Sequence, residues 1–137
     1  MIYIDTDILL DVALRRIPFW VDAASLLNRI AKGEAKAGTT PLVIANCLCI
    51  IQRLENKSSA EAFTKSCLQL LEEIPLAFDH QKKAMASTFK DKEDAFNYFA
   101  ALGSGCQAII TRNKSDFKPG KIPVFTAGEY LKKFPKR

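Results

Sequence analysis

Short apolar runs alternate with longer amphipathic segments along this chain, and this alternation predicts strands separated by helices. The runs at 2–4, 108–110 and 123–125 read as buried strands, with weaker strands predicted at 35–40 and 75–79. The segments between them carry apolar residues at helical spacing. They predict helices over 8–16, 19–32, 42–55, 58–74, 80–89, 92–105 and 126–134.

Polar and conformationally special residues mark the ends of these helices. Thr6 or Asp7 can cap the first helix, and Pro41 is suited to the first turn of the third. Ser58 and Glu61 have the spacing of a capping box. The stretch 111–121 is polar and predicts a loop after the strand at 108–110.

This order of elements predicts an α/β fold, a three-layer sandwich whose short, mostly parallel central sheet is flanked by helices. With 137 residues, 48% hydrophobic and 26% charged, we expect one domain over 1–137 that buries a core without disulfides or metal staples. No signal-peptide pattern or membrane-length apolar run is present, so we expect a cytoplasmic protein with no membrane partner.

Cysteine and charge content add two further expectations. The four cysteines (Cys47, Cys49, Cys67 and Cys106) lie in apolar segments, and with His80 as the single histidine they form no zinc-ligand spacing. We therefore expect buried thiols. Residues 91–137 carry nine basic and five acidic side chains, and this excess suits a polyanionic partner or simply a solvated surface.

Acidic side chains follow two of the predicted strands. Asp5 and Asp7 come directly after the first strand, and Asp116 lies in the loop after the strand at 108–110, while Asp94 begins a late helix. Asp7 can instead be a helix cap, and Asp94 a simple helix-N-terminal acid. Together the carboxylates predict an oxygen-ligand site for Mg²⁺ or Mn²⁺ at the strand-end edge of the sheet.

A phosphoacceptor loop of the phosphatase or response-regulator kind is a remote alternative for the acidic residues after the first strand. The response-regulator type also needs a lysine after a late strand, where this chain has Thr111 and Arg112.

Three blocks of sequence resemble the PIN domain, a family of α/β nucleases and nucleic-acid-binding proteins that includes VapC-like toxins. They are "IDTD" after the first strand, "DKEDAFNYFAALGSGCQAIITRNKSDF" and "PVFTAGEYL". The resemblance spans nearly the whole chain, and its late block is the specific part. It implies a Mg²⁺- or Mn²⁺-dependent ribonuclease with a small antitoxin partner, and family members often form homodimers.

Carried over by position, the resemblance assigns metal-binding and catalytic roles to Asp5, Asp94 and Asp116. The last family aspartate can also align with Asn113, and we favour Asp116 as the available acid. Two positions depart from the family pattern: Asp7 stands where the family usually has asparagine, and Asn46 where it usually has glutamate. Both remain candidate metal ligands.

The loss of that glutamate leaves two functions open. The chain is either an active endoribonuclease or a degenerate PIN domain that binds RNA or a protein without turnover.

Several neighbours of the acidic residues are candidate substrate contacts. Thr6 and Thr111 can hydrogen-bond a carboxylate or metal-bound water, or satisfy the local backbone. Arg112, Asn113 and Lys114 can position RNA phosphates, or be solvated loop residues. We expect Phe19 and Trp20 to lie in the core or in an interface, and the amphipathic helices leave room for a homodimer.

Overall fold

A computed structural model describes residues 1–135 of the chain, and five strands form one sheet within them. Its order is β3-β2-β1-β4-β5, and every neighbouring pair is parallel. The strands are β1 (Ile2–Ile4), β2 (Ala37–Thr39), β3 (Glu72–Glu73), β4 (Ala108–Ile110) and β5 (Val124–Phe125). The predicted fold class, a short parallel sheet flanked by helices, is confirmed.

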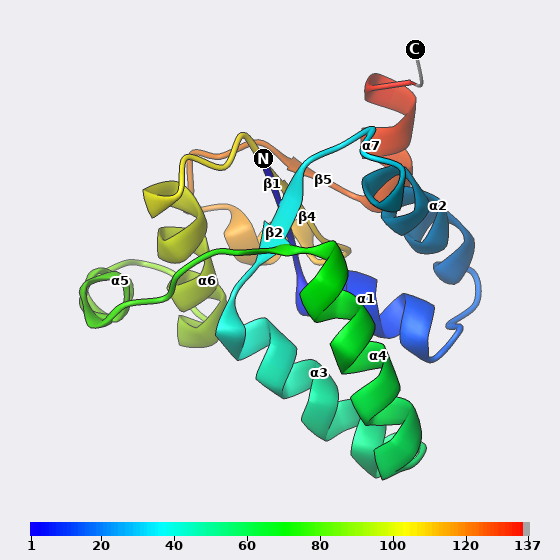
Figure 1. The fold of residues 1–137 in the computed structure, drawn as a ribbon. Helices are drawn as coiled ribbons and strands as arrows, with labels where there is room; N and C mark the ends of the chain where they lie inside the picture. The colour runs from blue at the N-terminus through cyan, green and yellow to red at the C-terminus, as the bar shows by residue number, and fades with distance from the viewer. Residues whose placement is uncertain (136–137) are drawn as a thin grey trace.

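Helices connect the strands and cover the sheet. They are α1 (Thr6–Ala13), α2 (Trp20–Ala31), α3 (Pro41–Leu54), α4 (Lys57–Leu70), α5 (Phe78–Met85), α6 (Lys92–Gly103), the 3₁₀ helix η1 (Lys114–Phe117) and α7 (Ala127–Lys133). Figure 1 shows α5 and α6 on one side of the strands and α2 and α7 on the other, with the α3–α4 pair extending below. The chain therefore enters α1, α3 and α6 around one end of the sheet.

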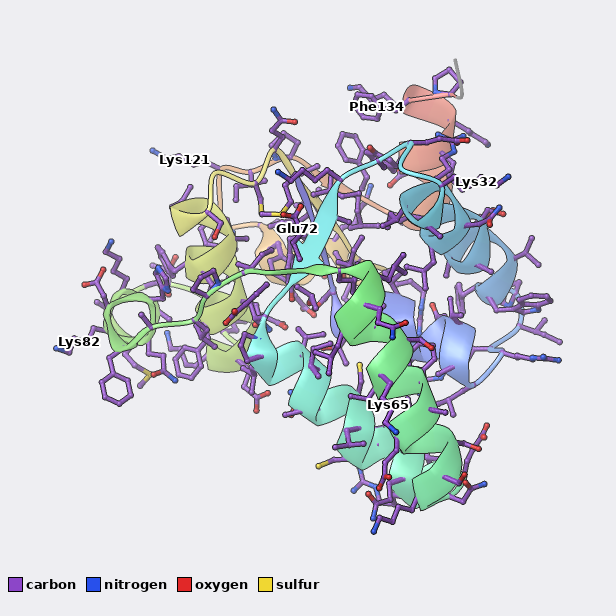
Figure 2. The ribbon with its side chains drawn as sticks, in the orientation of Figure 1. Lys32, Lys65, Glu72, Lys82, Lys121 and Phe134 are labelled. Carbon is purple, nitrogen blue, oxygen red and sulfur yellow. The ribbon has the colours of Figure 1, made fainter. Side chains whose placement is uncertain are left out.

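The core is built on the two central strands. Tyr3, Ile4, Ile109 and Ile110 are fully buried, as expected for parallel strands covered on both faces. Most charged side chains point outward, and Figure 2 labels lysines of this kind directly after α2, on α4, on α5 and in the loop after η1. At the sheet edge, Gly38 allows β3 to approach β2, because a Cβ there would lie 2.7 Å from the carbonyl oxygen of Glu72.

The predicted strand at 75–79 is wrong, and the strand in this region lies earlier, at β3. Glu72 and Glu73 pair with Gly38 and Thr39 of β2, so the predicted helix over 58–74 ends at Leu70. Leu71 and Ile74 flank β3 and are buried, and their spacing extends the apolar stripe of the helix in the sequence. A two-residue edge strand made of glutamates carries no apolar alternation by which to detect it.

Two N-caps lie earlier than predicted. Asp5, rather than Thr6 or Asp7, caps α1, and its carboxylate accepts a hydrogen bond from the Thr6 amide. Asn56, rather than Ser58, caps α4. The predicted polar loop at 111–121 contains the short helix η1, which buries Phe117.

One burial prediction needs correction. Cys47, Cys67 and Cys106 are buried as expected, but Cys49 is exposed on α3. Phe19 and Trp20 are 42% and 36% exposed, so of the two places predicted for them the core is excluded and an interface stays a prediction.

Two further expectations concern the membrane and the basic C-terminal end. Among the described residues, no helix is long and apolar enough to cross a membrane. Lys136 and Arg137, which contribute to the basic C-terminal segment, lie outside the described residues.

Candidate metal centre

The carboxyl ends of β1 and β4 bring two distant segments together. Ile4 pairs with Ile110, so Asp5 and Thr111 leave adjacent parallel strands at the same edge of the sheet. The amide of Asp5 donates to the carbonyl of Ile110, which extends this pairing by one residue. The Thr111 hydroxyl then donates to Oδ2 of Asp5 at 2.8 Å. The strand-end position predicted for these side chains is observed.

Asp5 is almost fully enclosed and strongly hydrogen-bonded. Its Oδ1 accepts from the Tyr3 hydroxyl and the Thr6 amide, both at 2.9 Å, while Oδ2 accepts from Thr111. Burial raises the pKa of Asp5 above its usual value, and these three hydrogen bonds act in the opposite direction. The donors therefore hold the carboxylate in one orientation, with both oxygens engaged.

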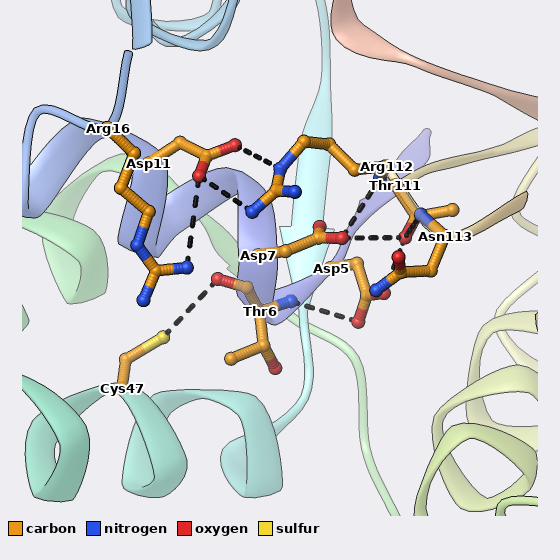
Figure 3. Close-up of polar contacts among 9 residues, drawn as sticks. All are labelled: Asp5, Thr6, Asp7, Asp11, Arg16, Cys47, Thr111, Arg112 and Asn113. Atoms are coloured by element: carbon orange, nitrogen blue, oxygen red, sulfur yellow. Dashed lines mark hydrogen bonds and ion pairs between the residues drawn. The ribbon is translucent and has the colours of Figure 1, made fainter. Parts of the chain in front are cut away.

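Asp7 lies in the first turn of α1 and faces the same group of residues (Figure 3). Its Oδ2 accepts from the Arg112 amide at 3.0 Å and lies 3.2 Å from the Thr111 hydroxyl oxygen. Its Oδ1 is buried and is the one buried side-chain oxygen or nitrogen of the described residues without a hydrogen-bond partner. Burial, followed by the charge of Asp5, raises the pKa of Asp7 to about 6.

Asp94 approaches this pair from the first turn of α6, where Asp91 is the N-cap. Burial, followed by the charge of Asp5, raises the pKa of Asp94 to about 7. Three further carboxylates act in the same direction, namely Asp91, Asp116 and Asp7. Asp94 is thus a half-buried acid whose pKa is raised further by the carboxylates of Asp5, Asp7 and Asp116, as expected where several carboxylates converge.

Asp116 is exposed on η1 at the outer side of the group. Its charge is among the causes that raise the pKa of both Asp5 and Asp94. The three predicted metal ligands, from the segments after β1, at the start of α6 and after β4, therefore lie within electrostatic reach of one another.

Position 46 borders this group on α3. The neighbouring residue, Cys47, packs its sulfur 3.9 Å from the Thr6 carbonyl, and the Asn46 side-chain nitrogen donates to Oε1 of Glu93 at 3.0 Å. Glu93 precedes Asp94 on α6. Asn46 thus links α3 to the first turn of α6 through a neutral amide.

Comparison with known proteins identifies the fold. The family model described as "PIN domain" matches residues 1–115 of this chain. The chain belongs to the PIN domain family. A relative, "Ribonuclease VapC1" of Aquifex aeolicus, is 22% identical over 138 residues, which cover 97% of this chain and 94% of the relative.

Solved structures share this PIN domain's fold at low sequence identity. The FitAcB structure from Neisseria gonorrhoeae superimposes with a TM-score of 0.70 at 14% identity, covering 93% of this chain and 99% of that chain. The VapC20 structure of Mycobacterium tuberculosis, titled a sarcin-ricin loop cleaving toxin, gives a TM-score of 0.65 at 14% identity, with 80% and 87% covered. Likeness at this level establishes the fold.

The donor set of this PIN domain fits a hard divalent cation by its chemistry. Carboxylate oxygens are the ligands that Mg²⁺ and Mn²⁺ prefer, and the partnerless oxygen of Asp7 is a buried acceptor without a donor. Within residues 1–135, however, no three His, Cys, Asp or Glu side chains are already gathered into a ligand set. The charges of neighbouring carboxylates nevertheless add to the burial that raises the pKa values of Asp5, Asp7 and Asp94.

The predicted phosphate-binding cations of this PIN domain have internal partners. Arg112 donates through Nε and an Nη to both oxygens of Asp11, at 2.7 and 3.1 Å, and its guanidinium lies 4.0 Å from the Phe19 ring centre. Lys114 forms an ion pair with Glu129 at 3.0 Å. Each side chain carries further N–H donors beyond those in its ion pair, so a phosphate contact does not require the pair to open.

The remaining predicted contacts lie beside the carboxylates. The amide of Asn113 donates to the Thr111 hydroxyl oxygen at 3.1 Å, and the Asn113 residue itself is exposed. Sequence reasoning missed Tyr3 and Asp11, which support Asp5 and Arg112 respectively. The signal for Asp11 was a single acid inside the apolar run "ILLDVAL", since a charge there needs a buried partner.

Proposed function

We propose that this PIN domain is a Mg²⁺- or Mn²⁺-dependent endoribonuclease. The observation that carries the proposal is the convergence of Asp5, Asp94 and Asp116 at one end of the sheet. Burial raises the pKa of Asp5 and of Asp94, and the charge of Asp116 adds to both shifts. Holding several carboxylates together is unfavourable without a cation, and a divalent cation offsets that repulsion. Asp5, Asp94 and Asp116 would hold the ion.

A divalent cation bound there would polarise the RNA phosphate and lower the pKa of an attacking water molecule. The protein's own groups have supporting roles. Tyr3, Thr6 and Thr111 fix the orientation of Asp5 through three hydrogen bonds of 2.8 to 2.9 Å. Asn113, exposed beside Thr111, would contact the RNA backbone. Buried, preorganised supports of this kind keep the ligand positions fixed during the reaction.

We further propose that the protein acts as the toxin of a toxin–antitoxin pair in the cytoplasm. Relatives and structural neighbours support this role by their names: a VapC ribonuclease, a sarcin-ricin loop cleaving toxin, and a "Toxin-antitoxin complex from Klebsiella pneumoniae". The last neighbour has a TM-score of 0.67 and covers 93% of this chain. The expected partners are RNA, a small antitoxin protein and a second copy of this chain.

The test is cleavage of a mixed, end-labelled RNA pool in Mg²⁺ and in Mn²⁺. The native protein is compared with Asp94→Asn, which removes a proposed ligand, and with Asn46→Glu, which adds a carboxylate on α3. Asp79→Asn is the matched control, because Asp79 is an exposed acid on α5 that pairs with Lys83. The proposal predicts cleavage by the native and control proteins and none by Asp94→Asn.

Two other outcomes would contradict the proposal in different ways. Cleavage that survives Asp94→Asn would place the chemistry elsewhere or reveal a contaminating nuclease. An inactive native protein that gains activity through Asn46→Glu would indicate an intact scaffold without turnover, and binding of RNA or protein would then be the function.

A further inference from the structure

Asp7 has an unusual environment for an aspartate in the first turn of a helix. Only 9% of the residue is exposed, and its Oδ1 is buried without a hydrogen-bond partner. Buried carboxylate oxygens in native proteins nearly always have a donor, so an orphaned one needs an explanation. An ionised carboxylate can only accept, so a bound cation would satisfy this oxygen.

The second carboxylate oxygen shows where Asp7 faces. Its Oδ2 lies 3.2 Å from the Thr111 hydroxyl, which also lies 2.8 Å from Asp5 Oδ2. A threonine hydroxyl has one hydrogen, so it cannot donate to both carboxylates at once. Asp5 and Asp7 therefore meet across a single shared donor, an arrangement that a bound cation would stabilise.

Helix α3 supplies no negative charge to this edge of the site. Its sequence, Pro41–Leu54, contains no acidic residue, and Asn46 donates its amide hydrogen to Glu93. The adjacent Cys47 contacts the Thr6 carbonyl, so position 46 lies between the first turns of α1 and α6. A glutamate at position 46 would add a carboxylate beside the first turn of α6, which carries Asp94.

We infer that Asp7 is a further ligand of the divalent cation, with Oδ1 as the ligating atom, and that it provides the negative charge that α3 lacks. The inference rests on the proposed function, since it requires the cation held by Asp5 and Asp94. It assigns a function to the one buried side-chain oxygen of the described residues that has no hydrogen-bond partner.

The substitution Asp7→Asn distinguishes two roles for Asp7, a ligand of the cation and a hydrogen-bond acceptor that only supports the loop. The asparagine carbonyl oxygen can still accept from the Arg112 amide, so the hydrogen bond that anchors the loop remains. The substitution removes a buried negative charge that Asp5 repels, so the metal-free protein should melt at a higher temperature. A ligand role predicts that Mn²⁺ affinity nevertheless falls by about tenfold or more.

The experiment is calorimetric titration of MnCl₂ into the native protein, Asp7→Asn, the double variant Asp7→Asn/Asn46→Glu, and the control Asp79→Asn. We expect the native and control proteins to bind with equal affinity, Asp7→Asn to bind weakly, and the added glutamate to restore most of the lost affinity. Asp7→Asn binding as tightly as the native protein would overturn the inference and leave the proposed function standing.

Failure of the proposed function gives a different result. The native protein would then show no Mn²⁺ binding, and this outcome would overturn both the proposed function and the inference about Asp7. If Asp7→Asn does not fold, the anomalous signal of manganese in crystals of the native protein decides the question. Direct coordination by Asp7 Oδ1 supports the inference, and a manganese ion that Asp7 does not contact overturns it.

Discussion

Replacing Arg112 by methionine should destabilise the protein, because Arg112 neutralises a fully buried acid. Its guanidinium forms two hydrogen bonds to Asp11, whose side chain is 1% exposed, and packs on Phe19. Methionine keeps the apolar stem but leaves Asp11 without its main partner. The Arg112 amide also donates to Asp7, so the pair anchors the loop that carries Thr111 and Arg112 beside the acids.

The magnitude follows from the burial of the two partners. Removing one partner of a buried ion pair costs about 3–5 kcal/mol. The lower end applies here, since the Arg112 side chain is 26% exposed and Arg16 lies 4.0 Å from Asp11, where it can replace part of the lost charge. We expect a loss of about 3 kcal/mol, which lowers Tm by about 10 °C in a chain of this size.

The assay is urea unfolding followed by far-ultraviolet circular dichroism. Lys114→Met is the matched control, because Lys114 and Glu129 form a pair whose side chains are 45% and 48% exposed, and exposed pairs contribute less than about 1 kcal/mol. The double variant Asp11→Leu/Arg112→Met removes both charges. Its loss of unfolding free energy should be much smaller than the sum of the losses in the two single variants.

A cost for Arg112→Met below about 1 kcal/mol would refute this reasoning about the buried ion pair. If that variant instead kept its stability and lost RNA affinity, Arg112 would be the phosphate contact that its position in the sequence suggests.

Three further predictions concern the acids and the start of α3. Asp94→Asn should reduce RNA cleavage by about 100-fold or more, measured as single-turnover rates in Mn²⁺. The raised pKa values of Asp5, Asp7 and Asp94 mean that the metal-free folded protein binds more protons than the unfolded chain between about pH 4 and pH 7. These groups should therefore lower Tm as pH rises through that window, and saturating Mn²⁺ should abolish the decline in a series of thermal melts; a decline unchanged by Mn²⁺ would contradict the metal site. Thr40→Val should cost about 2 kcal/mol in urea unfolding, because it removes the N-cap of α3 and leaves the buried Asn97 oxygen without its 2.6 Å donor. A Thr40→Ser variant should retain most of that stability.

The central strands could be predicted because their signals are local. The runs at 2–4 and 108–110 are apolar throughout and are followed by Asp5 and Thr111, so both the strands and their polar ends are visible in the sequence. Parallel pairing then brings those ends together, as the hydrogen bond between Thr111 and Asp5 shows. β3 could not be found in this way, because it is an edge strand of two glutamates stabilised by pairing with β2.

The supports of the site depend on contacts between distant segments. Arg112 and Asp11 are 101 residues apart, and only the folded chain shows that the arginine is paired with an acid on α1. The alternatives for Asp7 were likewise open in the sequence, since a first-turn acid is also typical of a helix cap. In the structure Asp5 is the N-cap of α1, and Asp7 is buried beside Thr111, which also contacts Asp5.

The central claim is that carboxylates from α1, α6 and η1 form a cation-dependent ribonuclease centre, and the most direct test is cleavage as a function of added metal. Protein treated with EDTA and dialysed is mixed with a labelled RNA pool, and Mn²⁺ is then titrated in. The account predicts no cleavage without metal, a saturable gain with Mn²⁺, and no gain for Asp94→Asn under the same conditions. Cleavage by the metal-free protein, or a gain that Asp94→Asn shares, would contradict it.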